Sequence, residues 1–293
     1  MRRPALNWRM QLTFLGTGAD SAYPLAFCAC EICRVAREKG GKNLRRRSSA
    51  ALDADLLIDL GPDSIQAMLH FGLNPAGLRF LLQTHPHHDH FDQNHLATRI
   101  SEYRGRMAQP LEIVASRGTL HRMTSMLQGM GFDGDLLKAK SHAELNISVQ
   151  VIEHGQTLQL GQRRVTAFTA NHDSSAECLI YAVEQGQSSL LYATDTDSLP
   201  EETLQAIRRA DLTFSTVVLD HTYGPGCNGG GHLNAARFQH TIDRFRHQGV
   251  LREKAKIYAT HLSHEGNMEH DQLTRYAARH GYTIPWDGLG ITL

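Results

Sequence analysis

The residues that could do chemistry gather in one short run, Thr84-His85-Pro86-His87-His88-Asp89-His90. Four of its side chains, His85, His87, Asp89 and His90, are of the types that bind zinc, manganese or iron. The run follows residues 78–83, an apolar stretch typical of a buried strand, and α/β proteins place their sites at strand ends. In an extended turn His85 and His87 point the same way, whereas Asp89 and His90 face a neighbouring point, so the spacing indicates two metal ions.

Two later strand ends also lead into polar residues. The predicted strands 164–170 and 190–192 run into Asn171-His172-Asp173 and Thr194-Asp195-Thr196-Asp197. A lone His or Asp there would ordinarily be a turn residue, but their order after the histidine run predicts that both reach the metal site. Asp59, just past the predicted strand segment 49–58, is expected to contact a ligand histidine on the side of the ring away from the metal. The glycine-rich stretch 224–231 predicts a loop that closes over a substrate and delivers His232.

A second candidate metal site lies near the amino terminus, where three of the five cysteines fall at Cys28, Cys30 and Cys33. The odd total and this tight spacing argue against a disulfide framework and for reduced thiols in a cytoplasmic protein. Three thiolates need a fourth ligand to close a tetrahedral zinc site. Reduced cysteines without a metal are the alternative. The basic stretch 39–47 is expected to be a solvated loop, with a phosphate-facing role for Arg45, Arg46 or Arg47 left open.

The order of the elements predicts the fold. Strands and helices alternate in two rounds, first over residues 11–130 and then from residue 147 to the end, without repeats or a proline-rich linker. This pattern predicts an α/β (α+β) fold in which two mixed sheets pack face to face with helices outside, an αββα sandwich. A length of 293 residues with 41% hydrophobic content allows one elaborated domain over residues 10–293. Residues 1–9 are expected to be a dispensable extension.

Charge and hydropathy narrow the range of binding partners that we expect. Thirty basic and thirty acidic side chains give a formal net charge of zero, which disfavours nucleic acid and an anionic membrane as main partners. No run is long and apolar enough for a membrane span, and the first ten residues lack the apolar core of a signal peptide. A small-molecule substrate and a cytoplasmic location are therefore expected. A homodimer stays open.

The apolar strand followed by His-x-His-x-Asp-His resembles the signature of the metallo-β-lactamase superfamily. Within it, the chain from Met10 onward is similar to the phosphoribosyl 1,2-cyclic phosphate phosphodiesterases of the carbon–phosphorus lyase pathway of phosphonate catabolism. The shared motifs include Leu-Gly-Thr-Gly, the cysteine knuckle, Thr-His-x-His-x-Asp-His, His-Leu-Asn, Thr-His-x-Ser-His and Trp-Asp-Gly. The knuckle together with Thr-His-x-Ser-His is the specific part, because most superfamily members lack it.

The resemblance implies roles for individual residues. It assigns His85, His87 and His172 to one divalent metal and Asp89, His90 and His261 to the other, with Asp195 bridging. It adds His264 to Cys28, Cys30 and Cys33 as the ligands of one structural zinc. His232 matches the family's active-site histidine outside the metal set, and His221 and His88 compete with it for the role of general acid.

The function that the resemblance implies is hydrolysis of a small cyclic phosphodiester by a metal-bridged hydroxide, with phosphoribosyl 1,2-cyclic phosphate as the expected substrate. The active-site metals would be manganese or zinc, with iron as a further option. A phosphodiesterase of the same fold acting on nucleotides or RNA ends is the first alternative. A non-hydrolytic metal-binding member is the second, although such relatives look degenerate in the histidine run and this chain is intact.

Overall fold

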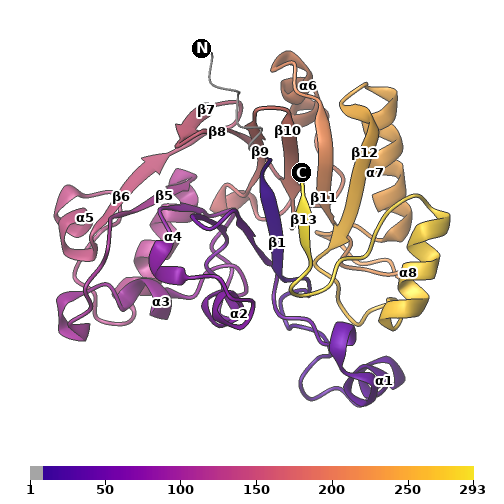
Figure 1. Ribbon diagram of the computed structural model, residues 1–293, viewed down its shortest axis with the longest axis horizontal. Helices are drawn as coiled ribbons and strands as arrows, with labels where there is room; N and C mark the ends of the chain where they lie inside the picture. The colour runs from indigo at the N-terminus through magenta and orange to yellow at the C-terminus, as the bar shows by residue number, and fades with distance from the viewer. Residues whose placement is uncertain (1–8) are drawn as a thin grey trace, which may run out of the picture.

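The computed structural model describes residues 9–293 as two β-sheets packed face to face, with helices on both outer faces (Figure 1). The predicted αββα sandwich is confirmed. The predicted extension, residues 1–9, lies outside the described residues except for Arg9. Among residues 9–293, no helix is both long and apolar enough to cross a bilayer.

The first sheet has seven strands in the order β13-β1-β2-β3-β4-β5-β6. Strands β3, β4, β5 and β6 are parallel neighbours. The pairs β13–β1, β1–β2 and β2–β3 are antiparallel. The bounds are β1 Gln11–Gly16, β2 Ser49–Leu52, β3 Leu56–Ile58, β4 Phe80–Leu82, β5 Leu111–Ala115, β6 Ile147–Val151 and β13 Gly290–Thr292.

The second sheet has six strands in the order β12-β11-β10-β9-β8-β7. Strands β10, β11 and β12 are parallel neighbours, and the other pairs are antiparallel. The bounds are β7 Thr157–Leu160, β8 Arg163–Thr169, β9 Leu179–Gln185, β10 Ser188–Ala193, β11 Phe214–Asp220 and β12 Leu251–Thr260.

Alternation along the buried strands explains the layers, because successive side chains of a strand point to opposite faces. In β4, Phe80 and Leu82 enter the core between the sheets, whereas Leu81 enters the core under the helices. In β10, Leu190 and Tyr192 face the first sheet, and Leu191 packs against the helices of the other side. A strand that is apolar on both faces is stable only between two other layers.

The helices complete the outer layers. Helices α2 to α4 pack on the first sheet, and α6 to α8 pack on the second (Figure 1). Their bounds, with those of the two remaining helices, are α1 Glu31–Lys39, α2 Ser64–His70, α3 Gln93–Ala97, α4 Arg117–Gln128, α5 Ala139–Leu145, α6 Glu201–Arg209, α7 Ala235–His247 and α8 His270–Arg279.

The basic segment 39–47 differs from the sequence prediction. Residues 31–39 form α1, which begins directly after Cys30, so the knuckle continues into a helix. Arg45 is buried, and its guanidinium donates to the Thr17 hydroxyl at 2.7 Å and the Pro285 carbonyl at 2.8 Å. The expectation of a solvated loop was therefore wrong for Arg45, because these partners satisfy its donors inside the protein.

Candidate metal centre

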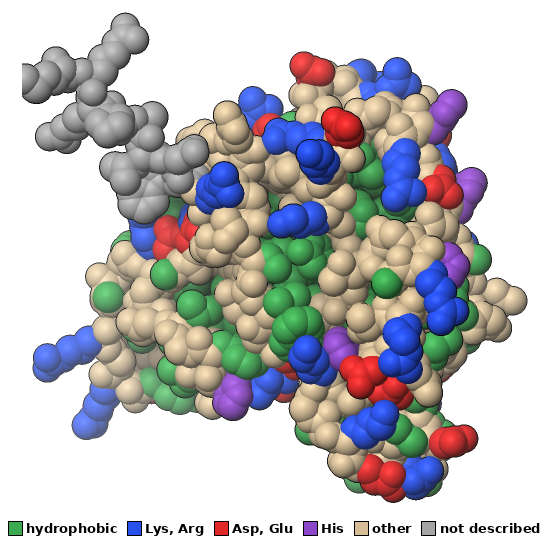
Figure 2. Space-filling view, turned by 45° about the vertical axis from the view of Figure 1, so that its right-hand side comes forward, with side chains coloured by type: hydrophobic (Ala, Val, Ile, Leu, Met, Phe, Trp, Pro, Cys, Tyr) green, Lys and Arg blue, Asp and Glu red, His purple; other side chains and the backbone are tan. Residues whose placement is uncertain are grey.

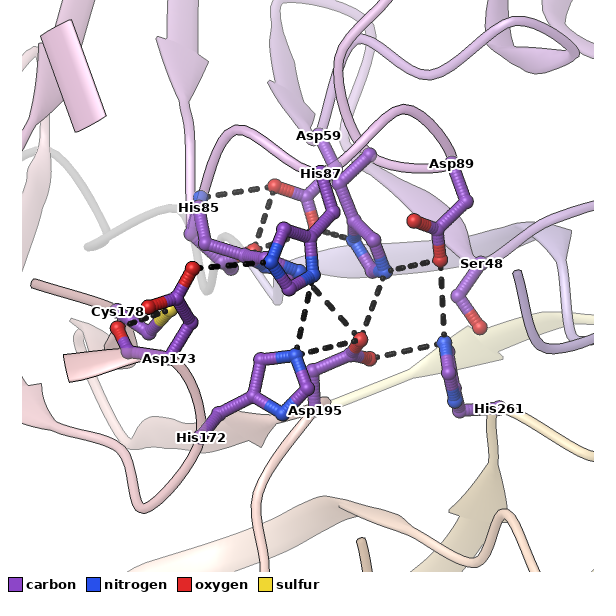
Figure 3. Close-up of polar contacts among 12 residues, drawn as sticks. Ser48, Asp59, His85, His87, Asp89, His172, Asp173, Cys178, Asp195 and His261 are labelled. Atoms are coloured by element: carbon purple, nitrogen blue, oxygen red, sulfur yellow. Dashed lines mark hydrogen bonds and ion pairs between the residues drawn. The ribbon is translucent and has the colours of Figure 1, made fainter. Parts of the chain in front are cut away.

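The candidate ligands meet where strand ends of both sheets come together. The loop after β4 supplies His85, His87, Asp89 and His90 from the first sheet. The second sheet supplies His172 after β8, Asp195 after β10 and His261 after β12. The residues that the sequence placed at strand ends thus lie in one cluster, and Figure 3 shows their side chains converging.

The first group of ligand atoms comes from His85, His87 and His172, and they lie within 4.8 Å of one another. The Nδ1 atom of His87 lies 3.2 Å from Nε2 of His172. The Oδ2 atom of Asp195 lies 3.5 Å from Nε2 of His85 and 3.8 Å from Nε2 of His172. Three imidazoles with one carboxylate oxygen beside them form a donor set suited to a divalent transition metal.

The second group consists of Asp89, His90, Asp195 and His261, and it is entirely buried. The Nε2 atom of His90 lies 3.0 Å from Asp89 and 3.2 Å from Asp195. The Nε2 atom of His261 lies 3.0 Å from the other oxygen of Asp195. Asp195 thus contacts both groups, which is the position expected of the bridging carboxylate that the sequence resemblance implied.

The outer ring nitrogens of three cluster histidines are already held by the protein. Nδ1 of His90 lies 2.7 Å from Asp59, and Nε2 of His87 lies 3.3 Å from Asp173. Nδ1 of His172 lies 3.0 Å from the Gly231 carbonyl. Such partners fix the ring and direct the other nitrogen inward, as around bound metals. Asp59 therefore makes the contact with a histidine that the sequence predicted.

Two threonines hold the remaining pair of histidines. Thr84 donates its hydroxyl proton to Asp59 at 2.9 Å, so it accepts from Nδ1 of His85 at 2.9 Å. Thr222 donates to Asp220 at 2.9 Å, so it accepts from Nδ1 of His261 at 2.8 Å. Each sheet thus contributes an Asp-Thr-His chain. Sequence reasoning missed both threonines and Asp220.

Three inner atoms of the cluster have close neighbours but no hydrogen bond. Nε2 of His85, Nε2 of His90 and Oδ1 of Asp195 are buried without a hydrogen bond. Burying a polar atom without a partner costs roughly 1–3 kcal/mol, and here three of them converge. A divalent cation would satisfy all of them at once, so the donor set fits the metals that the sequence predicted.

The electrostatics of the cluster agree with that fit. Burial lowers the pKa of His85 far below its usual value and also lowers the pKa of His172, which keeps both rings in the neutral form that binds metals. Burial opposes protonation of His261 too, but Asp195, Asp89 and Asp220 together outweigh it and raise the pKa of His261 to about 10. The carboxylates therefore create a field that favours positive charge at the centre of the cluster.

The three candidate general acids lie in different places. His232 lines the pocket above the cluster, stacks on His261 with 5.1 Å between ring centroids, and places Nδ1 2.7 Å from Asp220. Burial opposes its protonation, but Asp220 raises its pKa. His88 also lines the pocket, and it is exposed. His221 is fully buried against Tyr282 and does not reach the pocket.

The cysteine knuckle forms a separate cluster with His264. Ligand atoms of Cys28, Cys30, Cys33 and His264 lie within 4.8 Å of one another. Nδ1 of His264 is 3.5 Å from Sγ of Cys30 and 3.8 Å from Sγ of Cys28. The bond to His264 lowers the pKa of the Cys30 thiol to about 6, which favours the thiolate. The four residues that the sequence resemblance assigned to a zinc site are thus brought together.

The arginines considered for phosphate binding point elsewhere. Arg46 lies 3.5 Å from Asp287, and Arg47 lies 3.0 Å from Asp63. With Arg45 buried, none of the three is among the residues that line the pocket above the cluster.

Comparisons with solved structures extend over nearly the whole chain. A diphosphatase of the PhnP family has 18% sequence identity and a TM-score of 0.73, with 98% of each chain covered. Zinc-bound PqqB from Methylobacterium extorquens has 18% identity and a TM-score of 0.66, with 97% of this chain and 100% of the other covered. The short form of human tRNase Z has 17% identity and a TM-score of 0.61, with 96% and 98% covered. At these identities the likeness shows the fold alone.

The sequence itself carries the family assignment. A search of curated proteins finds no match. The family model described as "Beta-lactamase superfamily domain" matches residues 55–262, from the start of β3 to just past His261. That range holds every residue of the His/Asp cluster and more than half of the chain. The chain therefore belongs to the metallo-β-lactamase superfamily.

Proposed function

We propose that this chain is a metal-dependent phosphodiesterase that hydrolyses a small cyclic phosphodiester of a sugar. Phosphoribosyl 1,2-cyclic phosphate is the compound of this class that the sequence resemblance names. The observation that carries the proposal is the His/Asp cluster, whose outer ring nitrogens are held by the protein and in which three buried inner atoms have no hydrogen bond. The fold likeness to a diphosphatase and to yeast PDE1, at 11% identity and a TM-score of 0.63, is consistent with phosphoester chemistry.

The residues present fit two divalent ions. His85, His87 and His172 would hold one, and Asp89, His90 and His261 the other, with Asp195 beside both groups. Such ions supply Lewis-acid stabilisation of the phosphoryl oxygens and an acidified water that can attack phosphorus at neutral pH.

The chain's own residues would handle the proton of the leaving group. Asp220 holds Nδ1 of His232, so Nε2 of this ring is the atom available toward the pocket. A protonated His232 can give that proton to the departing sugar oxygen, and Asp220 stabilises the ring in this form. We assign the general acid to His232 rather than His88, because the exposed His88 ring makes no hydrogen bond with another of residues 9–293 that would fix its orientation.

We also propose one structural zinc on Cys28, Cys30, Cys33 and His264. It would join the amino-terminal part of α1 to the segment after β12, two parts of the chain that are more than 200 residues apart. Elemental analysis should find about three metals per chain. Cys30→Ser should lose one of them and unfold at lower temperature, whereas Cys227→Ser, a cysteine outside the cluster, should keep all of them.

The test of the function is hydrolysis by protein loaded separately with manganese or zinc. Turnover of phosphoribosyl 1,2-cyclic phosphate, of the same sugar without its 5-phosphate, and of bis(p-nitrophenyl) phosphate should be compared. Hydrolysis of a cyclic sugar phosphate above the generic diester supports the proposal. Activity on the generic diester alone would direct attention to nucleotides, and inactivity with a full metal complement would favour a non-hydrolytic member.

Nucleotides or RNA ends are the second candidate because the fold resembles human tRNase Z. The face drawn in Figure 2 does not favour a long polyanion, because a protein that binds nucleic acid usually presents a basic patch. On the face that Figure 2 shows, Lys and Arg side chains are interspersed with Asp and Glu around a strip of hydrophobic side chains. A small substrate therefore remains the better proposal.

A further inference from the structure

The pocket above the metal cluster has an acidic rim. Its cavity measures about 670 Å³, with buried ligands such as Asp195 and His261 in its floor. The exposed residues Asp20 and Glu265 also line it. Asp20 follows β1, and Glu265 lies in the loop after β12, next to His264. The rim is therefore where the part of a substrate remote from the reacting phosphate would lie.

Backbone contacts bring the segments that carry the two carboxylates toward Tyr223. The amide of Ala19 donates to the Leu262 carbonyl at 3.1 Å, which places Asp20 next to the end of β12. The amide of Gly224 donates to the Glu265 carbonyl at 2.9 Å, which places Glu265 next to Tyr223. Burial, most of all, and the charges of Glu265 and Asp20 raise the pKa of Tyr223, which agrees with both carboxylates lying near its phenol.

Tyr223 connects this rim to the catalytic groups. Its ring centroid lies 6.2 Å from that of His232, edge to face. A substrate whose leaving oxygen is beside His232 would therefore extend toward Tyr223 and the two carboxylates.

Basic side chains do not line the rim within residues 9–293. No Lys or Arg of residues 9–293 lines the pocket, and no ion pair in that range involves Asp20 or Glu265. Arg47, which donates to the Asp20 backbone carbonyl at 2.9 Å, has its guanidinium committed to Asp63 at 3.0 Å.

Each carboxylate keeps one oxygen for a ligand. One oxygen of Asp20 accepts from the Ser21 amide at 2.7 Å, and one of Glu265 accepts from the Ser263 hydroxyl at 3.3 Å. The second oxygen of each has no donor among residues 9–293. Ionised carboxylates accept hydrogen bonds from hydroxyl groups and repel a phosphate.

Building on the proposed function, we propose that Asp20 and Glu265 determine specificity by selecting a cyclic phosphodiester whose sugar carries free hydroxyl groups and no second phosphate. This inference departs from the compound that the resemblance names, because phosphoribosyl 1,2-cyclic phosphate carries a second phosphate at its 5 position. The rim offers acceptors for the 5-hydroxyl of ribose 1,2-cyclic phosphate and no cation for the 5-phosphate.

The test compares these two compounds, which differ only in the 5-phosphate, with the metal-loaded full chain. We expect kcat/KM to be at least about tenfold higher for ribose 1,2-cyclic phosphate. The double variant Asp20→Asn with Glu265→Gln should shift that ratio at least about tenfold toward the phosphorylated compound, because it removes both charges at nearly constant shape. Asn retains an oxygen for the Ser21 amide.

A matched control removes two charges elsewhere. Glu202 and Glu253 are exposed and do not line the pocket, so Glu202→Gln with Glu253→Gln should keep the wild-type ratio. Circular dichroism and metal content of both double variants establish that they are folded and loaded, and the two single variants show which carboxylate contributes more.

The possible outcomes distinguish failure of this inference from failure of the proposed function on which it rests. Hydrolysis of both compounds with an equal or higher kcat/KM for the phosphorylated one overturns the selection and leaves the phosphodiesterase in place. A wild-type preference that the rim variant does not move overturns the assignment to Asp20 and Glu265. If the loaded protein hydrolyses neither compound nor bis(p-nitrophenyl) phosphate, the proposed function is wrong and the inference is wrong with it.

Discussion

The two sheets support the metal cluster in the same way and use that support differently. In the first sheet, Asp59 at the end of β3 holds Thr84 and His90. In the second, Asp220 at the end of β11 holds Thr222 and His232. Each threonine in turn holds a candidate ligand, which is His85 in the half of the site formed by the first sheet and His261 in the half formed by the second.

The difference lies in the second histidine of each half. His90 is fully buried and directs Nε2 at Asp89 and Asp195. His232 has 17% of its side chain exposed and lines the pocket. One carboxylate thus positions a candidate metal ligand and the other a histidine that lines the pocket. The comparison teaches that the arrangement of Asp, Thr and His alone does not define a ligand, because access to the pocket also decides the role.

Asp195 joins the halves, so changing it should have the largest effect. Its two oxygens lie near His85, His90 and His261. We expect Asp195→Asn to lower kcat by about 1,000-fold or more and to reduce the metal content, because loss of metal removes several kcal/mol of transition-state stabilisation. Asp197 lies on the same loop as Asp195 and pairs with Arg237 of α7. The control variant Asp197→Asn should therefore retain both metals. Full activity of the Asp195→Asn variant would exclude a bridging role.

The paired histidines test the comparison directly. We expect His232→Ala to lower kcat by roughly 100-fold or more with both active-site metals retained, as for loss of a general acid. His90→Ala should lower kcat and remove a metal as well. Metal analysis beside steady-state kinetics distinguishes the two. Loss of metal from the His232 variant would place it in the ligand set, with Asp195, Asp220 and His261, which lie within 4.8 Å of it.

The threonines should behave alike if the halves are equivalent. Thr84→Val and Thr222→Val each remove a hydroxyl between a buried carboxylate and a ligand histidine at nearly constant volume. Loss of such an outer partner typically costs 10–100-fold in metal affinity, and we expect each variant to lose about tenfold in competition with a chelator. A large effect in one half alone would show that the two supports are unequal.

Sequence reasoning named the candidate ligands that the structure brings together, because four of them form a dense run after an apolar strand and the others follow later strands. The same reasoning about strand ends, applied to Asp220-His221-Thr222, would have identified Asp220 and Thr222 as the residues that hold His261. Alternate residues at a strand end face the same side, so Asp220 and Thr222 point together toward the site and His221 points into the core. Keeping His221 as a competitor of His232 for the role of general acid overlooked that alternation.

Other features could not be obtained from local pattern. The partners of buried Arg45, at Thr17 and Pro285, are 28 and 240 residues away in the sequence, so nothing near residue 45 signals them. The acidic rim likewise joins Asp20 to Glu265 across the whole chain. Such contacts depend on how the sheets pack, whereas the fold class depended only on the order and periodicity of the elements.

His221 provides the smallest and last test, because it separates a structural histidine from the ligands beside it. Burial lowers its pKa to about 4, below the unfolded value near 6.5. Between these values the unfolded chain binds a proton that the folded chain excludes, so stability falls as pH falls. From pH 7.5 to 5.5 this one group should cost about 1.4 kcal/mol in urea unfolding. His221→Phe should reduce the pH-dependent loss by that amount, whereas His240→Asn, at an exposed site, should not. An unchanged loss in the His221→Phe variant would mean that His221 is protonated in the folded state, and a histidine that is charged and buried would need a carboxylate partner, as His90 and His232 have.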